Sequence, residues 1–129
     1  MRPQPLICVN DVEASSRWFQ RLLGLTSAHG GKEYERLNTA DGKLVLQLHR
    51  WDVEHHHGAI GDPAIPPGNG VLLWFDIDDL DAAVARAEEM NVEVVMPHYH
   101  HEGAFQWEIW LRDPNGYTVV LSMPDGRAP

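Results

Sequence analysis

Two segments hold most of the histidines of this chain, whose side chains can bind a metal or transfer a proton. The first is HRWDVEHHHG, residues 49–58, and the second is PHYHHEG, residues 97–103. Neutral imidazole is a ligand for zinc, copper, nickel or iron, and alternation along either segment places two imidazoles on one side. The candidate metal ligands are His55, His57, His100 and His101. Because the HExxH spacing is absent, two other interpretations stay open: a ligand-contacting rim with Trp51 and Tyr99, and solvated polar loops.

The composition is that of one acidic, folded domain. The chain has 129 residues, with 10 Lys and Arg against 19 Asp and Glu, and 43% of its residues are hydrophobic. A net charge of −9 argues against nucleic acid as a partner, because phosphates require a basic face. No apolar run is long enough to cross a membrane and no signal peptide is evident, so we expect a cytoplasmic protein. The single cysteine, Cys8, excludes disulfides within the chain and is expected to be an inert buried thiol.

The elements that position these residues repeat along the chain. An apolar strand at 5–10 precedes a helix that ends near Gly24, and strands are expected at 25–29, 33–39 and 43–49. The second half repeats this order, with strands at 71–77, 92–96, 105–112 and 117–122 and a helix after the first of them. The helix caps Asp11 and Asp79 are 68 residues apart. The pattern therefore predicts an α+β fold of two tandem βαβββ units, 4–57 and 71–123, joined by a Gly- and Pro-rich linker at 58–70 within one domain.

This order of elements resembles the vicinal oxygen chelate superfamily, and within it the glyoxalase/bleomycin resistance branch. The matching stretches are VNDVEASSRWFQRLLGL, FDIDDLDAAVARAEEMNVEVV and WLRDPNGYTVVLS. The resemblance implies a cup-shaped mixed sheet with the helices on its outer face, and a homodimer, because these units commonly pair between chains. In metal-dependent members a divalent cation lies in the cup.

The resemblance also locates the cation's usual ligand positions in this chain. They correspond to Gln4, Leu72 and Val120, with Leu46 from the last strand of the first unit. Only Gln4 offers an oxygen, and one amide cannot hold a divalent ion. We therefore expect the usual metal site to be absent, while a divalent metal on the histidine segments stays open.

The turn Asp113-Pro114-Asn115-Gly116 predicts which side chains face the cup. A three-residue loop opposes Trp110 to Val120 and Glu108 to Ser122, so Glu108 and Trp110 share the cup face with Val120. A two-residue loop would move them to the other face. Trp74 follows the alternation of Leu72. The same reasoning at Asp41-Gly42 puts Tyr34 and Arg36 beside Leu46 on the cup side.

Glu108 is the candidate catalytic residue. On an apolar wall its pKa would be raised, so that it could act as a general base or pair with a cation. The alternative interpretation is a surface glutamate that pairs with Arg112 or another basic group.

Two classes of function follow. The first is a binding protein that sequesters an organic ligand, cationic or aromatic, in an aromatic cup. The second is a metal-dependent lyase, isomerase or dioxygenase that uses a histidine site, or Glu108 as base. The expected ligand-binding residues are Gln4, Tyr34, Arg36, Trp51, Leu72, Trp74, Tyr99, Trp110 and Val120.

Overall fold

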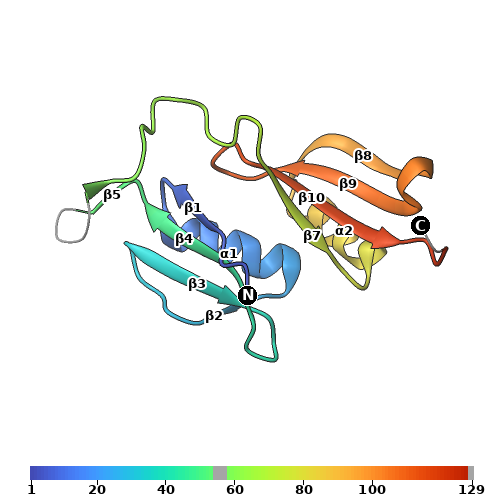
Figure 1. Ribbon diagram of the computed structural model, residues 1–129, viewed down its shortest axis with the longest axis horizontal. Helices are drawn as coiled ribbons and strands as arrows, with labels where there is room; N and C mark the ends of the chain where they lie inside the picture. Colours follow the sequence, from blue (N-terminus) through green and yellow to red (C-terminus); the bar gives the residue numbers. More distant parts are fainter. Residues whose placement is uncertain (54–57, 128–129) are drawn as a thin grey trace. The chain divides into compact units, whose positions relative to one another are not determined.

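The structure is a computed structural model that describes residues 1–53 and 58–127 (Figure 1). The chain divides into two compact units, Met1–Ile65 and Pro66–Pro129. Each unit contains one α-helix and a four-stranded mixed sheet with the helix packed on one face, which confirms the α+β class (Figure 1).

The first unit has the order βαβββ, followed by a small two-stranded ribbon. Its elements are β1 (Leu6–Val9), α1 (Val12–Leu23), β2 (Thr26–Ser27), β3 (Tyr34–Asn38), β4 (Leu44–Arg50), β5 (Asp52–Val53) and β6 (Gly58–Ala59). The sheet order is β1-β4-β3-β2, with β1 parallel to β4. Asp11 caps α1 by accepting a hydrogen bond from the Ala14 amide at 3.0 Å, and Gly24 ends the helix at φ 67°.

The second unit repeats the same plan. Its elements are β7 (Leu72–Asp76), α2 (Leu80–Glu89), β8 (Glu93–His101), the 3₁₀ turn η1 (Glu102–Ala104), β9 (Gln106–Arg112) and β10 (Thr118–Pro124). The sheet order β7-β10-β9-β8 matches that of the first unit position by position. Asp79 caps α2 through the Ala82 amide at 3.0 Å. No helix in residues 1–53 and 58–127 has the length and apolar character needed to span a membrane.

Each sheet packs its apolar face against its own helix. In the first unit Leu37, Leu46 and Leu48 are fully buried, as are Phe19 and Leu22 of α1. In the second unit the buried apolar residues include Leu111, Val119 and Leu121 from the sheet and Leu80 and Ala83 from α2. Because strand side chains alternate, every second residue of these strands lies on the face away from the helix.

The register predicted for β9 and β10 is confirmed. Trp110 opposes Val120 and Glu108 opposes Ser122. The Asp113 amide donates to the Tyr117 carbonyl at 2.9 Å, and Gly116 takes φ 102°, as the three-residue loop requires.

The register predicted for β3 and β4 is wrong. A bulge between Leu37 and Asn38 shifts the pairing by one residue, so Tyr34 opposes His49 and Arg36 opposes Gln47. Leu46 instead opposes Leu37 on the helix side, where both are buried. One extra residue in a strand moves all later side chains to the other face.

The second histidine segment is a strand rather than a loop. The prediction ended this strand at residue 96, before Pro97, but β8 continues to His101. Pro97 is tolerated because β8 lies at the edge of its sheet, and the pairing with β9 is irregular between Met96 and Tyr99.

A buried carboxylate in the first unit ties the loop after β2 to its sheet. Glu35, on the helix side of β3, accepts hydrogen bonds from the hydroxyls of Ser16 and Ser27, each at 2.7 Å. It also accepts from the backbone amides of His29 at 3.2 Å and Gly30 at 2.8 Å. The role of Glu35 is structural, because all of these donors belong to the loop or to α1.

Candidate functional site

The polar centre of the second unit is Glu108, on the sheet face away from α2. Tyr99 Oη and Trp110 Nε1 donate to its Oε1 at 2.6 and 2.9 Å. Gln106 Nε2 donates to Oε2 at 2.6 Å, and His101 Nδ1 lies 3.1 Å from the same oxygen. Only 1% of Glu108 is exposed.

These donors reverse the expected shift of the Glu108 pKa. Burial raises the pKa, but the hydrogen bonds from Tyr99, Trp110, Gln106 and His101 together lower it by more than burial raises it. The result is a pKa of about 2. The prediction of a raised pKa was therefore wrong, because the wall around the carboxylate is not apolar. A carboxylate this acidic is a weak general base near neutral pH.

Arg112, the basic residue considered as an alternative partner of Glu108, does not pair with it. Arg112 instead lies 3.4 Å from Glu93 and donates to the Thr118 hydroxyl at 2.6 Å. The negative charge of Glu108 is therefore stabilised by hydrogen bonds from polar side chains.

Two tryptophans lie on the same sheet face as Glu108. The rings of Trp74 and Trp110 are 6.2 Å apart in an edge-to-face arrangement, and Trp74 Nε1 donates to Ser122 Oγ at 2.8 Å. Val120, which pairs with both tryptophans across the sheet, is fully buried. We call this surface, formed by Trp74, Trp110, Tyr99, His101 and Glu108, the aromatic face.

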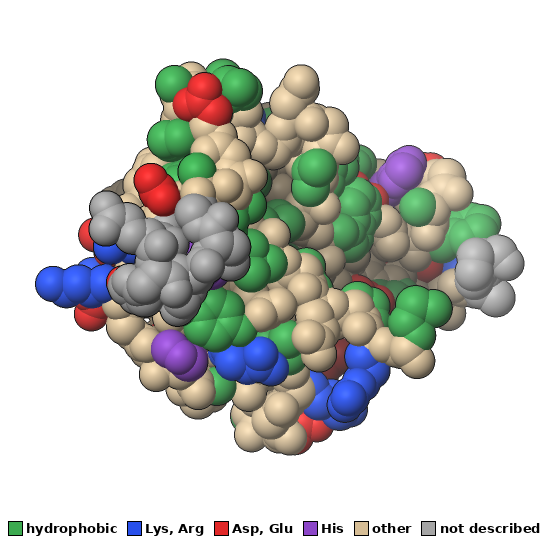
Figure 2. Space-filling view, turned by 60° about the vertical axis from the view of Figure 1, so that its left-hand side comes forward, with side chains coloured by type: hydrophobic (Ala, Val, Ile, Leu, Met, Phe, Trp, Pro, Cys, Tyr) green, Lys and Arg blue, Asp and Glu red, His purple; other side chains and the backbone are tan. Residues whose placement is uncertain are grey.

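Part of the aromatic face is exposed. Trp74 and the neighbouring Leu72 are each 43% exposed, a high value for such large apolar side chains. Figure 2 shows hydrophobic side chains, in green, at several places on the surface of the protein. An exposed apolar surface beside fixed polar groups is typical of a ligand-binding site.

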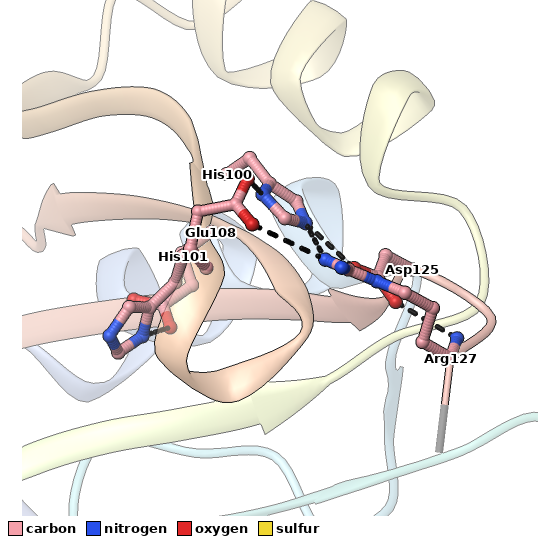
Figure 3. Close-up of polar contacts among 6 residues, drawn as sticks. His100, His101, Glu108, Asp125 and Arg127 are labelled. Atoms are coloured by element: carbon pink, nitrogen blue, oxygen red, sulfur yellow. Dashed lines mark hydrogen bonds and ion pairs between the residues drawn. The ribbon is translucent and has the colours of Figure 1, made fainter. Parts of the chain in front are cut away.

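Two of the four histidines expected to bind a metal, His100 and His101, point to opposite sides of β8 (Figure 3). His101 lies beside Glu108 on the aromatic face. His100 packs on the other side against Trp107, with ring centroids 4.7 Å apart. Adjacent residues of a strand alternate in direction, so the pair cannot converge on one ion.

His100 belongs to an ionic cluster near the end of β10 (Figure 3). Its Nδ1 lies 2.6 Å from Glu102 and its Nε2 lies 2.7 Å from Asp125, which also pairs with Arg127 at 2.6 Å. The hydrogen bond with Asp125, followed by the contact with Glu102, raises the His100 pKa, whereas Arg127 holds the Asp125 pKa well below its usual range. Both ring nitrogens are occupied, so His100 is not available to a metal.

Among the described residues, the remaining candidate ligands do not form a site for a divalent cation. His55 and His57 lie outside the described residues. Within residues 1–53 and 58–127, no three His, Cys, Asp or Glu side chains gather closely enough to hold a metal ion. The positions expected to carry the ligands offer the hydrocarbon side chains of Leu72 and Val120.

The candidates of the first unit lie on β3 and in the segments that flank β1 and β4. Tyr34 Oη donates to Gln47 Oε1, Arg36 Nη1 donates to Tyr34 Oη at 3.2 Å, and Gln47 Nε2 donates to the Gln4 carbonyl at 3.0 Å. Trp51 is fixed by a 3.0 Å hydrogen bond from its Nε1 to Asn10 Oδ1.

An open groove of about 710 Å³ borders this network. Its lining residues come from the loop before β3 and from β3 and β4: His29, Gly30, Gly31, Lys32, Glu33, Tyr34, Gln47 and His49. Gln4 and Arg36 line a second groove of about 460 Å³ instead.

Two polar residues of these networks were not among the predicted site residues. Gln106 follows the same alternation as Glu108 and Trp110, so the sequence did contain a signal for it. Gln47 takes the position expected for Leu46 because of the bulge in β3, for which the sequence has no clear signal.

Several solved structures share this fold. They include a lactoylglutathione lyase from Agrobacterium tumefaciens, 17% identical with a TM-score of 0.69, covering 97% of this chain and 94% of that one. The fosfomycin resistance protein FosX from Listeria monocytogenes is 12% identical with a TM-score of 0.71, covering 95% and 92%. A glyoxalase/bleomycin resistance protein/dioxygenase from Nocardioides is 19% identical with a TM-score of 0.71, covering 100% and 89%. At these identities the likeness establishes the fold alone.

The family itself follows from the sequence match. The model of one superfamily matches residues 3–121, nearly the whole chain. This match agrees with the repeated βαβββ order of the two units. The chain therefore belongs to the Glyoxalase/Bleomycin resistance protein/Dioxygenase superfamily.

Proposed function

We propose that this protein binds a planar organic cation on the aromatic face of its second unit. The observation that carries the proposal is the edge-to-face pair Trp74 and Trp110 beside the buried, ionised Glu108. The faces of indole rings attract cations, and more strongly where water is excluded.

Charge supports the same class of ligand. The chain carries a net charge of −9, so its field concentrates cations near the surface. Glu108 has no Lys or Arg partner in the part of the chain that the structure describes, and its charge is spread over the donors Tyr99, Trp110, Gln106 and His101. A bound cation would therefore be attracted by a charge that no Lys or Arg of the described residues neutralises.

Titration with N-methylacridinium, a planar cation, tests this function by calorimetry. We expect saturable binding that Trp74→Ala weakens about 10-fold, in line with one lost cation–π contact. Trp107→Ala is the matched control, because Trp107 is similarly exposed but contacts His98 and His100 on the other face. Absence of binding, or equal losses in the two variants, would refute the proposal.

The expected homodimer and cytoplasmic location remain predictions that accompany this function. Sedimentation equilibrium measures the first directly, with twice the 14.6 kDa chain mass as the expected result.

A further inference from the structure

The hydrogen bond between His101 and Glu108 determines which ring nitrogen of His101 carries a proton. Glu108 is ionised and can only accept, so Nδ1, at 3.1 Å from Oε2, must be the donor. In the neutral ring Nε2 then has no hydrogen and presents its lone pair as an acceptor.

That acceptor is open. Nε2 of His101 has no hydrogen-bond partner among residues 1–53 and 58–127, and 49% of the side chain is exposed. A Cβ added at Gly103 would lie 3.6 Å from Nε2. The absence of a side chain at Gly103 therefore leaves the approach to Nε2 clear.

The His101 ring is also linked to Trp110 through Glu108. His101 contacts Oε2 of Glu108, while Trp110 and Tyr99 contact Oε1 of the same carboxylate. We therefore expect a flat ligand that rests on Trp110 to reach the His101 ring.

We propose that Glu108 positions His101 so that Nε2 accepts a hydrogen bond from an N–H group of a cationic aromatic ligand bound on the aromatic face. This inference rests on the proposed function and narrows it. The ligands of this class are cations that carry an N–H on a protonated ring nitrogen or on an arylamine. Quaternary ammonium ions, which lack the N–H, do not belong to it.

The first test needs no ligand. Nitrogen-15 NMR of the imidazole ring reports which nitrogen is protonated in the neutral form. We expect His101 to be in the Nδ1–H form in the native protein, and to lose this preference in Glu108→Gln, whose amide can both donate and accept. An Nε2–H form in the native protein would overturn the assignment, whatever the protein binds.

The second test compares two cations that have the same ring system and the same charge. Protonated 4-(dimethylamino)pyridine carries a ring N–H, and 4-(dimethylamino)-1-methylpyridinium carries a methyl group in its place. We expect the native protein to bind the first about 10-fold more tightly, the value of one hydrogen bond that involves a charged group.

Two variants isolate the acceptor. His101→Asn keeps an amide donor for Glu108 but removes Nε2, and Gly103→Leu leaves the His101–Glu108 pair intact while covering Nε2. Both should abolish the preference for the N–H probe. If native protein binds both probes equally and Trp74→Ala weakens both, the proposed function stands and the role of His101 is refuted. If neither probe binds, both proposals fail.

Discussion

Glu35 and Glu108 occupy equivalent strands of the two units, β3 and β9, yet they serve different purposes. Both are buried, at 3% and 1% exposure, and both have a lowered pKa. They point to opposite faces of their sheets: Glu35 toward α1, and Glu108 away from α2.

The difference lies in their donors. Glu35 accepts from two serines and from backbone amides, which are short, rigid groups of the loop and helix that it joins. Among the described residues, the donors to Glu108 are all side chains, and one of these, His101, is 49% exposed. A carboxylate satisfied by backbone amides holds a fold together, whereas one satisfied by large, partly exposed side chains also organises a surface.

The largest effect is expected for Glu35→Ala. The substitution leaves the buried Ser16 hydroxyl, the Ser27 hydroxyl and the Gly30 amide without their acceptor, and each such loss at a buried group costs about 1–3 kcal/mol. We expect the free energy of unfolding in urea to fall by about 4 kcal/mol. Glu89→Ala, at an exposed position of α2, is the control and should change stability by less than about 0.5 kcal/mol.

Glu108→Gln should have a smaller effect on stability and a larger one on binding. The amide keeps the shape of the side chain and one acceptor oxygen, so we expect a loss of about 2 kcal/mol in unfolding free energy. Affinity for N-methylacridinium should fall about 10-fold, because the negative charge is gone. An unchanged affinity would contradict the proposed role of that charge.

Acid should reveal the same carboxylate in the native protein. The folded pKa of Glu108 is about 2, below its ordinary value of 4.5. Its contribution to stability is therefore complete above the ordinary pKa and is lost as the pH falls from 4.5 toward 2. Between about pH 5 and pH 3, native protein should lose more stability in urea unfolding than Glu108→Gln does; equal losses would show that Glu108 does not contribute.

The smallest effect is expected at His100, whose ionic cluster lies near the surface. Because its folded pKa is raised above the ordinary 6.5, its contribution is complete below 6.5 and is lost as the pH rises through the folded value. The melting temperatures of native protein and His100→Asn should therefore differ more at about pH 6 than at about pH 9. A difference that grew with pH would contradict the pairing with Asp125 and Glu102.

The fold was largely predictable because its signals are local. The caps Asp11 and Asp79, the apolar alternation and the turn at Pro114 and Gly116 specify the elements and the β9–β10 register. The β3–β4 register was not predictable, since the bulge at Leu37 and Asn38 has no proline or glycine to mark it.

The site was predictable only in part. Alternation placed Glu108, Trp74 and Trp110 on one face, but the Glu108 pKa depends on how the side chains of Tyr99 and Gln106 turn, which no pattern specifies. The histidine content of a segment does not predict the direction in which each side chain points. His100 and His101 are neighbours in sequence and lie on opposite faces of one strand.

The most direct test of the account is the affinity of N-methylacridinium for Glu35→Gln and Glu108→Gln, measured side by side under conditions where both variants are folded. The account predicts that Glu108→Gln loses about 10-fold in affinity while Glu35→Gln binds as the native protein does, although it is the less stable of the two. Equal affinities in the two variants, or a loss confined to Glu35→Gln, would contradict it.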